Sequence, residues 1–175
     1  MKVRIKVIAY LGLLIALDIV ITRFCSIQSP DSASWRIGFG FVPLSITGQL
    51  FGPIWGMVHG LISDFVGAIA FPKGPFFYGY TLSNIMRGLI YGLFLYKCSD
   101  RKLGIVVRCV LCALCVAIFV DLGMNSYWDT MLRGIPFEVN VYTKLVSASI
   151  NFVIRIATMP FYVMFVKKYI KKNLR

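Results

Sequence analysis

Residues 103–124, LGIVVRCVLCALCVAIFVDLGM, are apolar at nearly every position, and this run decides the fold class. A helix that crosses a bilayer needs about 20 mostly apolar residues. Five further stretches are similarly apolar: residues 7–22, 39–51, 54–71, 80–96 and 144–166. We therefore predict an all-α integral membrane protein with about six transmembrane helices. The stretch 39–51 is short and is closed by Gly52 and Pro53, so the second and third stretches could instead form a re-entrant hairpin.

The composition supports a membrane protein: 58% of the residues are hydrophobic and 15% are charged, against about 25% charged in an average soluble domain. The first apolar stretch lacks a clear small-residue cleavage site, so we expect it to remain as the first helix. The connections leave no room for a nucleotide-binding domain, and no phosphate-binding glycine loop with its lysine is present. Active transport would therefore draw its energy from a partner or an ion gradient. No internal repeat typical of secondary transporters is evident.

The basic residues indicate the topology. There are 19 Lys and Arg against 7 Asp and Glu, and they gather before the first stretch, around residues 97–108 and after residue 166. The positive-inside rule places these three groups, and with them both the N- and the C-terminus, in the cytoplasm. Stretches 23–43, 71–79 and 127–143 are then expected outside. This pattern favours membrane lipid, and no nucleic acid, as the partner of the basic residues.

Reactive side chains give little support to an enzyme. Cys109, Cys112 and Cys115 share a helical face, but a metal site would need a fourth ligand, so we predict that they pack in the membrane and that no metal is bound. His59 is the single histidine, and we expect it to pack or to hydrogen-bond. No Ser/His/Asp or paired-carboxylate constellation stands out, and we predict neither enzymatic activity nor a cofactor.

Ionisable residues inside the predicted spans are more informative, because each costs at least about 2.5 kcal/mol at a helix centre unless it faces protein or water. They are Asp18, Asp64, Arg87, Asp121 and Arg155. Asp64 and Arg87 both lie eight residues below an outer helix end, about 12 Å at 1.5 Å per residue, so they could pair. Asp121 and Arg155 also lie at similar depths. Each residue could form a structural ion pair or contact a substrate.

The same outer half gathers amides and aromatic rings: Asn84, Asn125, Tyr127, Trp128 and Asn151, with Trp35, Phe39, Phe76, Phe77 and Tyr78 above them. The rings could simply anchor the protein at the membrane interface. Combined with charges at one depth, they predict a pocket that is open to the outside and suits a flat aromatic ligand with a polar edge. On the first helix, Gly12 and Ala16 share a face that would let another helix approach closely.

Several motifs in order carry a family resemblance. The runs ITRFCSIQSP, WRIGFGFVPLSITGQLFGPIWG and SDFVGAIAFPKGPFFYGYTLSNIMRGLIYGLFLY resemble the folate-type substrate-binding (S) components of energy-coupling factor (ECF) vitamin transporters. The similarity covers most of residues 10–97 and continues faintly through NSYWDTMLRGIPF and ATMPFYVMF. It implies that residues 1–175 form a single transmembrane substrate-binding domain in the bacterial cell membrane. That domain would capture a vitamin outside and deliver it through a shared module of one transmembrane coupling subunit and two ATPases.

The resemblance also implies roles for residues. Gly12 and Ala16 would dock on the coupling subunit, and Asp64 or an asparagine would bind the pterin edge of folate. Basic groups would meet its glutamate tail: Arg36, Lys73, Arg133 or Lys144. We expect residues 23–43 to close over the ligand. The candidate substrate-binding residues are Trp35, Arg36, Phe39, Asp64, Lys73, Phe76, Tyr80, Asn84, Arg87, Asn125, Tyr127, Trp128, Asn151 and Arg155.

One segment departs from the folate-type pattern. In TKLVSASINFVIR, residues 143–155, Asn151 stands where these proteins commonly carry a basic residue, and Arg155 is displaced. The chain could therefore be an S component for another vitamin or precursor. The intramembrane charges keep a self-sufficient ion-coupled transporter or channel as an alternative, and a third alternative is a small integral-membrane enzyme with Asp64, His59 and Asp121 as candidate catalysts.

Overall fold

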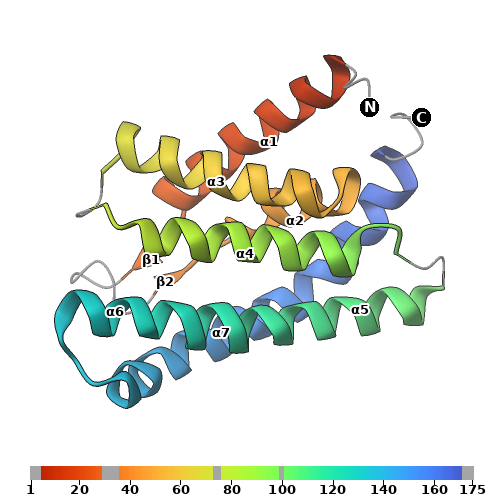
Figure 1. The fold of residues 1–175 in the computed structure, drawn as a ribbon. Helices are drawn as coiled ribbons and strands as arrows, with labels where there is room; N and C mark the ends of the chain where they lie inside the picture. The colour runs from red at the N-terminus through yellow and green to blue at the C-terminus, as the bar shows by residue number, and fades with distance from the viewer. Residues whose placement is uncertain (1–4, 29–35, 73–75, 99–100, 171–175) are drawn as a thin grey trace.

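The computed structural model describes residues 5–28, 36–72, 76–98 and 101–170, which form a bundle of helices with one small hairpin of strands (Figure 1). The elements in chain order are α1 (Ile5–Phe24), β1 (Ile27–Gln28), β2 (Arg36–Ile37), α2 (Phe41–Phe51), α3 (Pro53–Ala70), α4 (Tyr78–Leu95), α5 (Lys102–Cys115), the π-helical η1 (Val116–Met124), α6 (Asn125–Arg133), α7 (Phe137–Phe165) and the π-helical η2 (Val166–Ile170). The strands pair antiparallel, with Ile27 opposite Ile37.

The described helices form six rods, because α5, η1 and α6 follow one another without a break, as do α7 and η2. Four rods are long and apolar enough to cross a membrane: Val7–Phe24, Pro53–Ala70, Lys102–Arg133 and Phe137–Lys168. The predicted all-α multi-pass fold is confirmed. α2 has only 11 residues, about 16 Å at 1.5 Å per residue, so it is shorter than the roughly 30 Å hydrocarbon core. α4 has 18 residues but carries several polar side chains.

The expected outer loop at residues 127–143 is wrong. This stretch is helical except for residues 134–136, where Gly134 adopts a positive φ of 67° and ends α6. The apolar stretches of the sequence predicted only the apolar parts of the last two rods. The ends of these rods that meet at residues 134–136 are helices with mixed polarity, in which Ser126, Asp129 and Asn140 are buried while their neighbours are exposed or half-buried.

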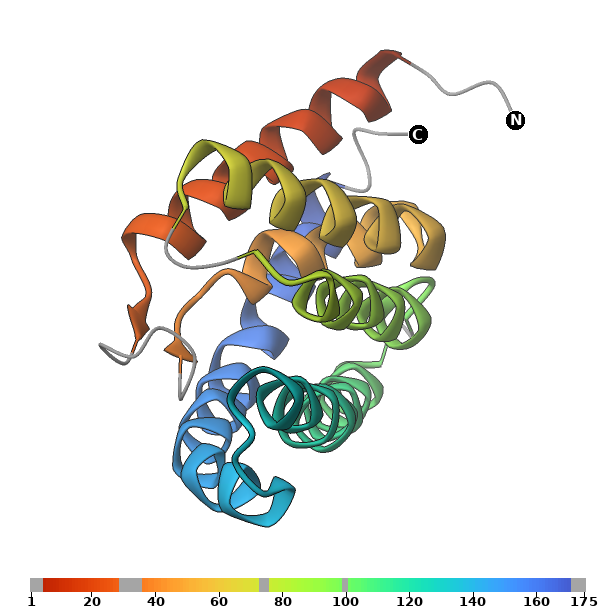
Figure 2. The same ribbon diagram turned by 60° about the vertical axis from the view of Figure 1, so that its left-hand side comes forward.

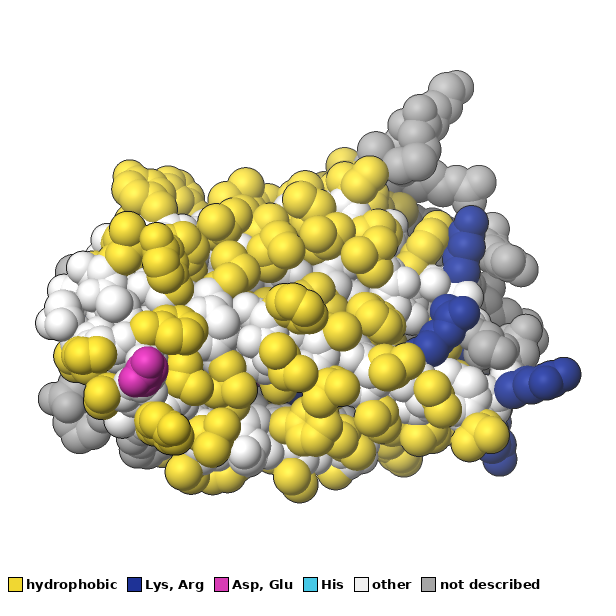
Figure 3. All heavy atoms as spheres, turned by 60° about the horizontal axis from the view of Figure 1, so that its bottom comes forward, with side chains coloured by type: hydrophobic (Ala, Val, Ile, Leu, Met, Phe, Trp, Pro, Cys, Tyr) yellow, Lys and Arg dark blue, Asp and Glu magenta, His cyan; other side chains and the backbone are white. Residues whose placement is uncertain are grey.

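Both ends of the described chain lie at the same end of the bundle, where α1 begins and η2 ends (Figures 1 and 2). The visible Lys and Arg side chains gather at this end, and the surface between the two ends is largely apolar (Figure 3). This distribution is what a protein needs when its waist faces lipid and one end faces charged headgroups. α1 diverges from the other helices towards this end (Figure 1).

Glycines let α3 and α4 approach backbone to backbone. A Cβ atom added at Gly88 would overlap the carbonyl oxygen of Gly56, and one added at Gly60 would overlap the carbonyl oxygen of Asn84. Small residues at such crossings let membrane helices pack closely. On the other side of α4, Cys109 and Cys112 lie in the apolar core with no exposed surface, which confirms their predicted packing role.

Candidate functional site

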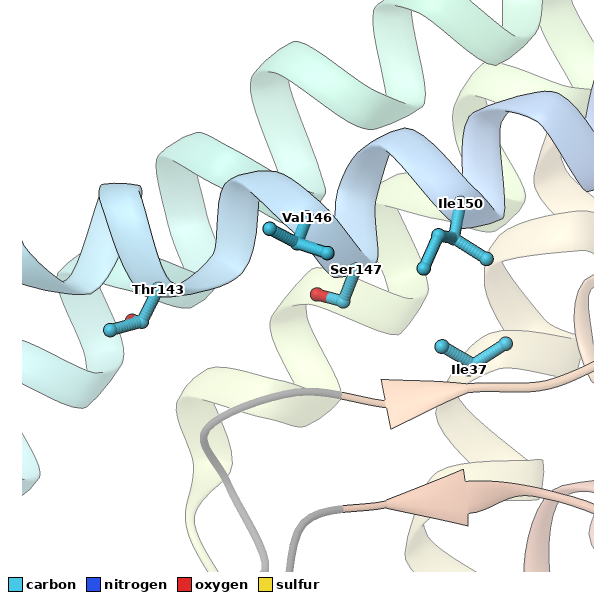
Figure 4. Close-up of a pocket in the computed structure, with 5 residues that line it drawn as sticks. All are labelled: Ile37, Thr143, Val146, Ser147 and Ile150. Atoms are coloured by element: carbon cyan, nitrogen blue, oxygen red, sulfur yellow. The ribbon is translucent and has the colours of Figure 1, made fainter.

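A pocket of about 240 Å³ lies between β2 and the N-terminal half of α7. Thr143, Val146, Ser147 and Ile150 line it from successive turns of α7, and Ile37 of β2 faces Ile150 across it (Figure 4). The wall is mainly apolar, with the hydroxyls of Thr143 and Ser147 as polar groups. Since Ile37 belongs to the predicted outer loop 23–43, that loop contributes directly to the pocket wall.

Below this pocket, α7 continues its buried face through Asn151 and Arg155 to a charged group within the bundle. We call Arg87, Asp121, Asn125 and Arg155 the Asp121 cluster. The two oxygens of Asp121, on η1, accept hydrogen bonds from Arg87 Nη2 at 2.8 Å and from Arg155 Nη1 at 2.6 Å. Asp121 and Arg155, which were expected at similar depths, form an ion pair. π-helical segments are rare and often occur at functional sites.

The predicted pairing of Asp64 with Arg87 is wrong. The two oxygens of Asp64 accept hydrogen bonds from Thr81 Oγ1 at 2.6 Å and Asn84 Nδ2 at 2.9 Å. Asn84 in turn accepts a hydrogen bond from Arg87 Nη1 at 2.8 Å, so the amide bridges the two charges. Counting residues from the helix ends gave the depth of these groups but not their direction around the helix axis, and Arg87 reaches towards η1.

The Asp121 cluster leaves polar atoms without partners. Among the described residues, the buried Arg87 Nε, Arg155 Nε and Asn125 Oδ1 make no hydrogen bond. A buried polar atom that lacks a partner costs about 1–3 kcal/mol. Two donors and one acceptor therefore remain available around one carboxylate, and this arrangement favours a polar ligand.

A second buried ion pair, which the sequence did not predict, lies nearer the connection between α6 and α7. Asp129 of α6 pairs with Lys144 of α7 and accepts a hydrogen bond from Tyr80 of α4, while Lys144 also donates to the carbonyl oxygen of Asn125 at 2.7 Å. Asp129 has 1% and Lys144 6% of its surface exposed. Lys144, proposed above for a ligand tail, is thus already engaged. The helical spacing of Ser126 and Asp129 is the signal that could have identified this pair.

Aromatic side chains gather at the N-terminal end of α4. The indole of Trp128 donates to Ser83 Oγ at 3.1 Å, and its ring lies edge-on to Phe77. Other candidate rings are more exposed: Phe39 at 46%, Phe76 at 41% and Tyr127 at 50%. Trp35, Lys73 and the side chain of Arg36 lie outside the described residues, while Arg133 ends α6.

The structure thus brings together eight of the candidates from α3, α4, α6 and α7: Asp64, Tyr80, Asn84, Arg87, Asn125, Trp128, Asn151 and Arg155. Phe39, Phe76 and Tyr127 remain exposed. In the part of the chain that the structure describes, no three His, Cys, Asp or Glu side chains are placed to hold a metal ion.

The two predicted docking residues lie on the exposed face of α1. Gly12 and Ala16 are both exposed, and a Cβ added at Gly12 would meet no atom within 4 Å. The buried side of α1 instead carries Leu11, Ile15 and Asp18. The small-residue face is therefore available to another helix.

Comparisons with known proteins agree with this architecture. The family model described as ECF-type riboflavin transporter, S component, matches residues 2–169. The folate transporter FolT of Clostridium novyi (strain NT) is 40% identical over 149 residues, which cover 85% of this chain and 83% of that protein. The folate transporter FolT of Leuconostoc mesenteroides subsp. mesenteroides is 30% identical over 125 residues, or 70% of this chain and 62% of that protein.

A solved structure shows the same fold. The crystal structure of FolT bound with folic acid superposes with a TM-score of 0.81 at 29% sequence identity, and the match covers 91% of this chain and 93% of that one. The resemblance drawn from the sequence motifs is confirmed, and the relatives are named as transporters rather than enzymes. This chain belongs to the family of ECF-type transporter S components.

Proposed function

We propose that this protein is the high-affinity folate-binding S component of an ECF importer in a bacterial cell membrane, with residues 1–175 acting as one substrate-binding domain. The observation that carries the proposal is the set of buried polar atoms in the Asp121 cluster that have no hydrogen-bond partner among the described residues; Arg155 of this cluster lies two turns along α7 from Ser147 of the pocket wall. The names of the relatives and the folic acid in the similar crystal structure support folate as the ligand.

The chemistry of a pterin ring suits this site. One edge of the ring offers a carbonyl oxygen and a ring nitrogen as acceptors, which complement the free donors Arg87 Nε and Arg155 Nε. The amino group of the ring is a donor that complements Asn125 Oδ1. Apolar walls with few well-placed polar groups are typical of small-molecule pockets, and flat rings bury a large area against them. The glutamate tail would extend outwards, where Arg36, Lys73 and Arg133 are the remaining basic candidates.

The pocket volume of about 240 Å³ lies below the roughly 300–1,000 Å³ usual for ligand pockets. We infer that the hairpin of β1 and β2 moves outwards to admit the whole vitamin and closes over it afterwards. Ile37 then forms part of the closing wall.

The proposed orientation places the basic end in the cytoplasm and the pocket outside, following the positive-inside rule. The exposed Gly12 then lies on the half of α1 nearer the cytoplasm and Ala16 just past the middle of the helix, and both dock on the coupling subunit that works with two ATPases. Replacing either residue with Trp should abolish complex formation and leave folate binding intact, measured by co-purification and by titration. Complex formation at the wild-type level would exclude this face.

Titration of the purified protein in detergent tests the ligand. We expect folate to quench tryptophan fluorescence tightly and saturably at one molecule per chain, with thiamine, riboflavin and a pyrimidine precursor as comparators. Riboflavin matters most, because the matching family model carries its name and a flavin ring presents similar acceptors. A response to riboflavin but not to folate would keep the S-component role and change the substrate. If none of the four compounds changed the tryptophan fluorescence, the proposal that the protein binds a vitamin would be wrong.

A further inference from the structure

α1 is the least embedded of the four long apolar spans. In its apolar span 17% of the residues are buried, against 22%, 28% and 39% in the other three spans. It packs against α2 and α3 through Leu11, Ile15 and Asp18. Asp18 is the charged residue among these three, and it is 6% exposed. The position of α1 therefore depends strongly on what holds this carboxylate.

A chain of hydrogen bonds runs from Asp18 through three helices. Asp18 Oδ2 lies 3.2 Å from His59 Nε2 on α3, and His59 Nδ1 lies 2.7 Å from Thr47 Oγ1 on α2. Thr22 Oγ1 donates to the other oxygen of Asp18 at 2.9 Å. His59 and Thr47 have no exposed surface. We call Asp18, Thr22, Thr47 and His59 the Asp18 cluster.

The segment that leaves the pocket wall touches this cluster directly. Gly40 lies three residues after Ile37 and one residue before α2. A Cβ added at Gly40 would overlap the hydroxyl of Thr22 and lie 3.1 Å from Asp18 Oδ1. A displacement of Ile37 by a ligand would therefore move backbone that is in contact with the Asp18 cluster, and only a glycine leaves room for that contact.

The contacts from Ile37 through Gly40 to the Asp18 cluster join two parts of the molecule with different roles. At one end Ile37 lines the pocket, and at the other α1 presents Gly12 and Ala16 on the side away from Asp18. If α1 rotated or tilted about its contact at Asp18, the exposed face that carries Gly12 and Ala16 would point in a different direction. α2 joins both ends, because it follows the pocket segment and carries Thr47.

We propose that the Asp18 cluster couples the ligand pocket to the docking face of α1, so that bound ligand changes the affinity of the protein for the coupling subunit. Asp18, His59 and Thr47 are positioning residues that act through α1 and touch neither ligand nor partner. The proposal rests on the proposed function. Coupling between two sites is reciprocal, so the coupling subunit changes the affinity for folate by the same factor.

The test measures two dissociation constants on the purified protein: that of folate, and that of the module of coupling subunit and ATPases with and without saturating folate. For the wild type we expect the two module constants to differ by at least about fivefold, within the usual range for coupled sites. Thr47→Val removes the hydroxyl that meets His59, and Asp18→Asn removes the charge. In both variants the ratio of the module dissociation constants with and without folate should approach one. The affinity for folate should stay within about threefold of the wild-type value.

Two further variants serve as controls. Thr47→Ser keeps the hydroxyl and should keep the wild-type ratio. Thr158→Val removes a hydroxyl that, like that of Thr47, bonds the carbonyl four residues earlier, at 2.7 Å on α7, and should also keep the ratio. A purely structural role would instead lower the melting temperature and folate affinity together and leave the ratio unchanged.

The outcomes separate the two proposals. Wild-type protein that binds no folate at all would contradict the proposed function. Folate binding with equal module affinity in both ligand states would overturn the coupling and leave the proposed function standing. An unchanged ratio in both Thr47→Val and Asp18→Asn would overturn it equally, and the second variant is nearly isosteric, so it serves if the first does not fold.

Discussion

The Asp121 cluster and the Asp18 cluster are both buried charged groups that join three helices, but they differ in how completely they are satisfied. In the Asp18 cluster, each side-chain nitrogen and oxygen has a described partner. In the Asp121 cluster, three buried atoms have none among the described residues. Complete satisfaction makes a buried network rigid, whereas open donors and acceptors are costly until something binds them. The difference distinguishes a network that holds helices from one that awaits a ligand.

Of the substitutions considered, Asp121→Asn should have the largest effect on stability and on folate binding. The change leaves two buried guanidinium groups without a counter-charge, and removal of one partner from a buried ion pair typically costs 3–5 kcal/mol. We expect a fall in melting temperature of roughly 10 °C in detergent and loss of folate binding. Glu138→Gln, at an exposed site on α7, should change neither. Near-wild-type stability would mean that water reaches the cluster and solvates the two guanidinium groups.

Gly88→Ala should loosen both clusters together. The added methyl group overlaps the carbonyl of Gly56 and pushes α4, which carries Arg87, away from α3, which carries His59. Overpacking of this kind costs about 1–3 kcal/mol, measured as a lower melting temperature. Gly12→Ala, where the methyl group meets open space, should melt like the wild type. Equal melting of the two variants would show that the helices separate without cost.

Asp64→Asn should weaken folate binding about tenfold without loss of fold. Asp64 adjoins the Asp121 cluster through Asn84, and charge-assisted hydrogen bonds contribute about 1.5–3 kcal/mol. Fluorescence titration measures the change, and Ser63→Ala on the same helix is the control. Wild-type affinity in Asp64→Asn would remove Asp64 from the site and restrict ligand recognition to the Asp121 cluster.

Trp128→Phe should have the smallest effect. It removes one hydrogen bond, to Ser83, worth about 1 kcal/mol, and leaves the apolar ring packed against Phe77. Because Trp128 is two turns beyond Asp121 on the same rod, we expect this variant to lose most of the folate-induced quenching. Trp55→Phe, on the basic half of α3, should keep it. Quenching that depends on Trp55 would place the ligand nearer the Asp18 cluster.

The sequence predicted the helices well where apolar length defines them. It also predicted the depth of the intramembrane charges, because depth follows from the rise per residue. The direction of a side chain around its helix follows from tertiary packing, which the sequence does not give. Asp121 therefore pairs with Arg155 at the same depth, whereas the pairing of Asp64 with Arg87 was wrong. Asp129 was missed because its segment, polar on one face, was assigned to a loop. The hydrogen bonds from His59 to Asp18 and Thr47 join residues 41 and 12 positions apart, which no local pattern specifies.

The shortness of α2 has a consequence for how the protein is made. Insertion machinery selects segments by their hydrophobicity over the length of a full span, and a segment of 11 residues that includes Ser45, Thr47 and Gln49 falls short of that length. A single residue, Gly52, joins α2 to α3, so the two helices enter the bilayer as one hairpin. Ser45 and Gln49 of α2 find partners on α7, at Tyr162 and Val163, only after the last helix has been synthesised. Assembly of the ligand site is therefore a late event, completed when the C-terminal rod joins the bundle.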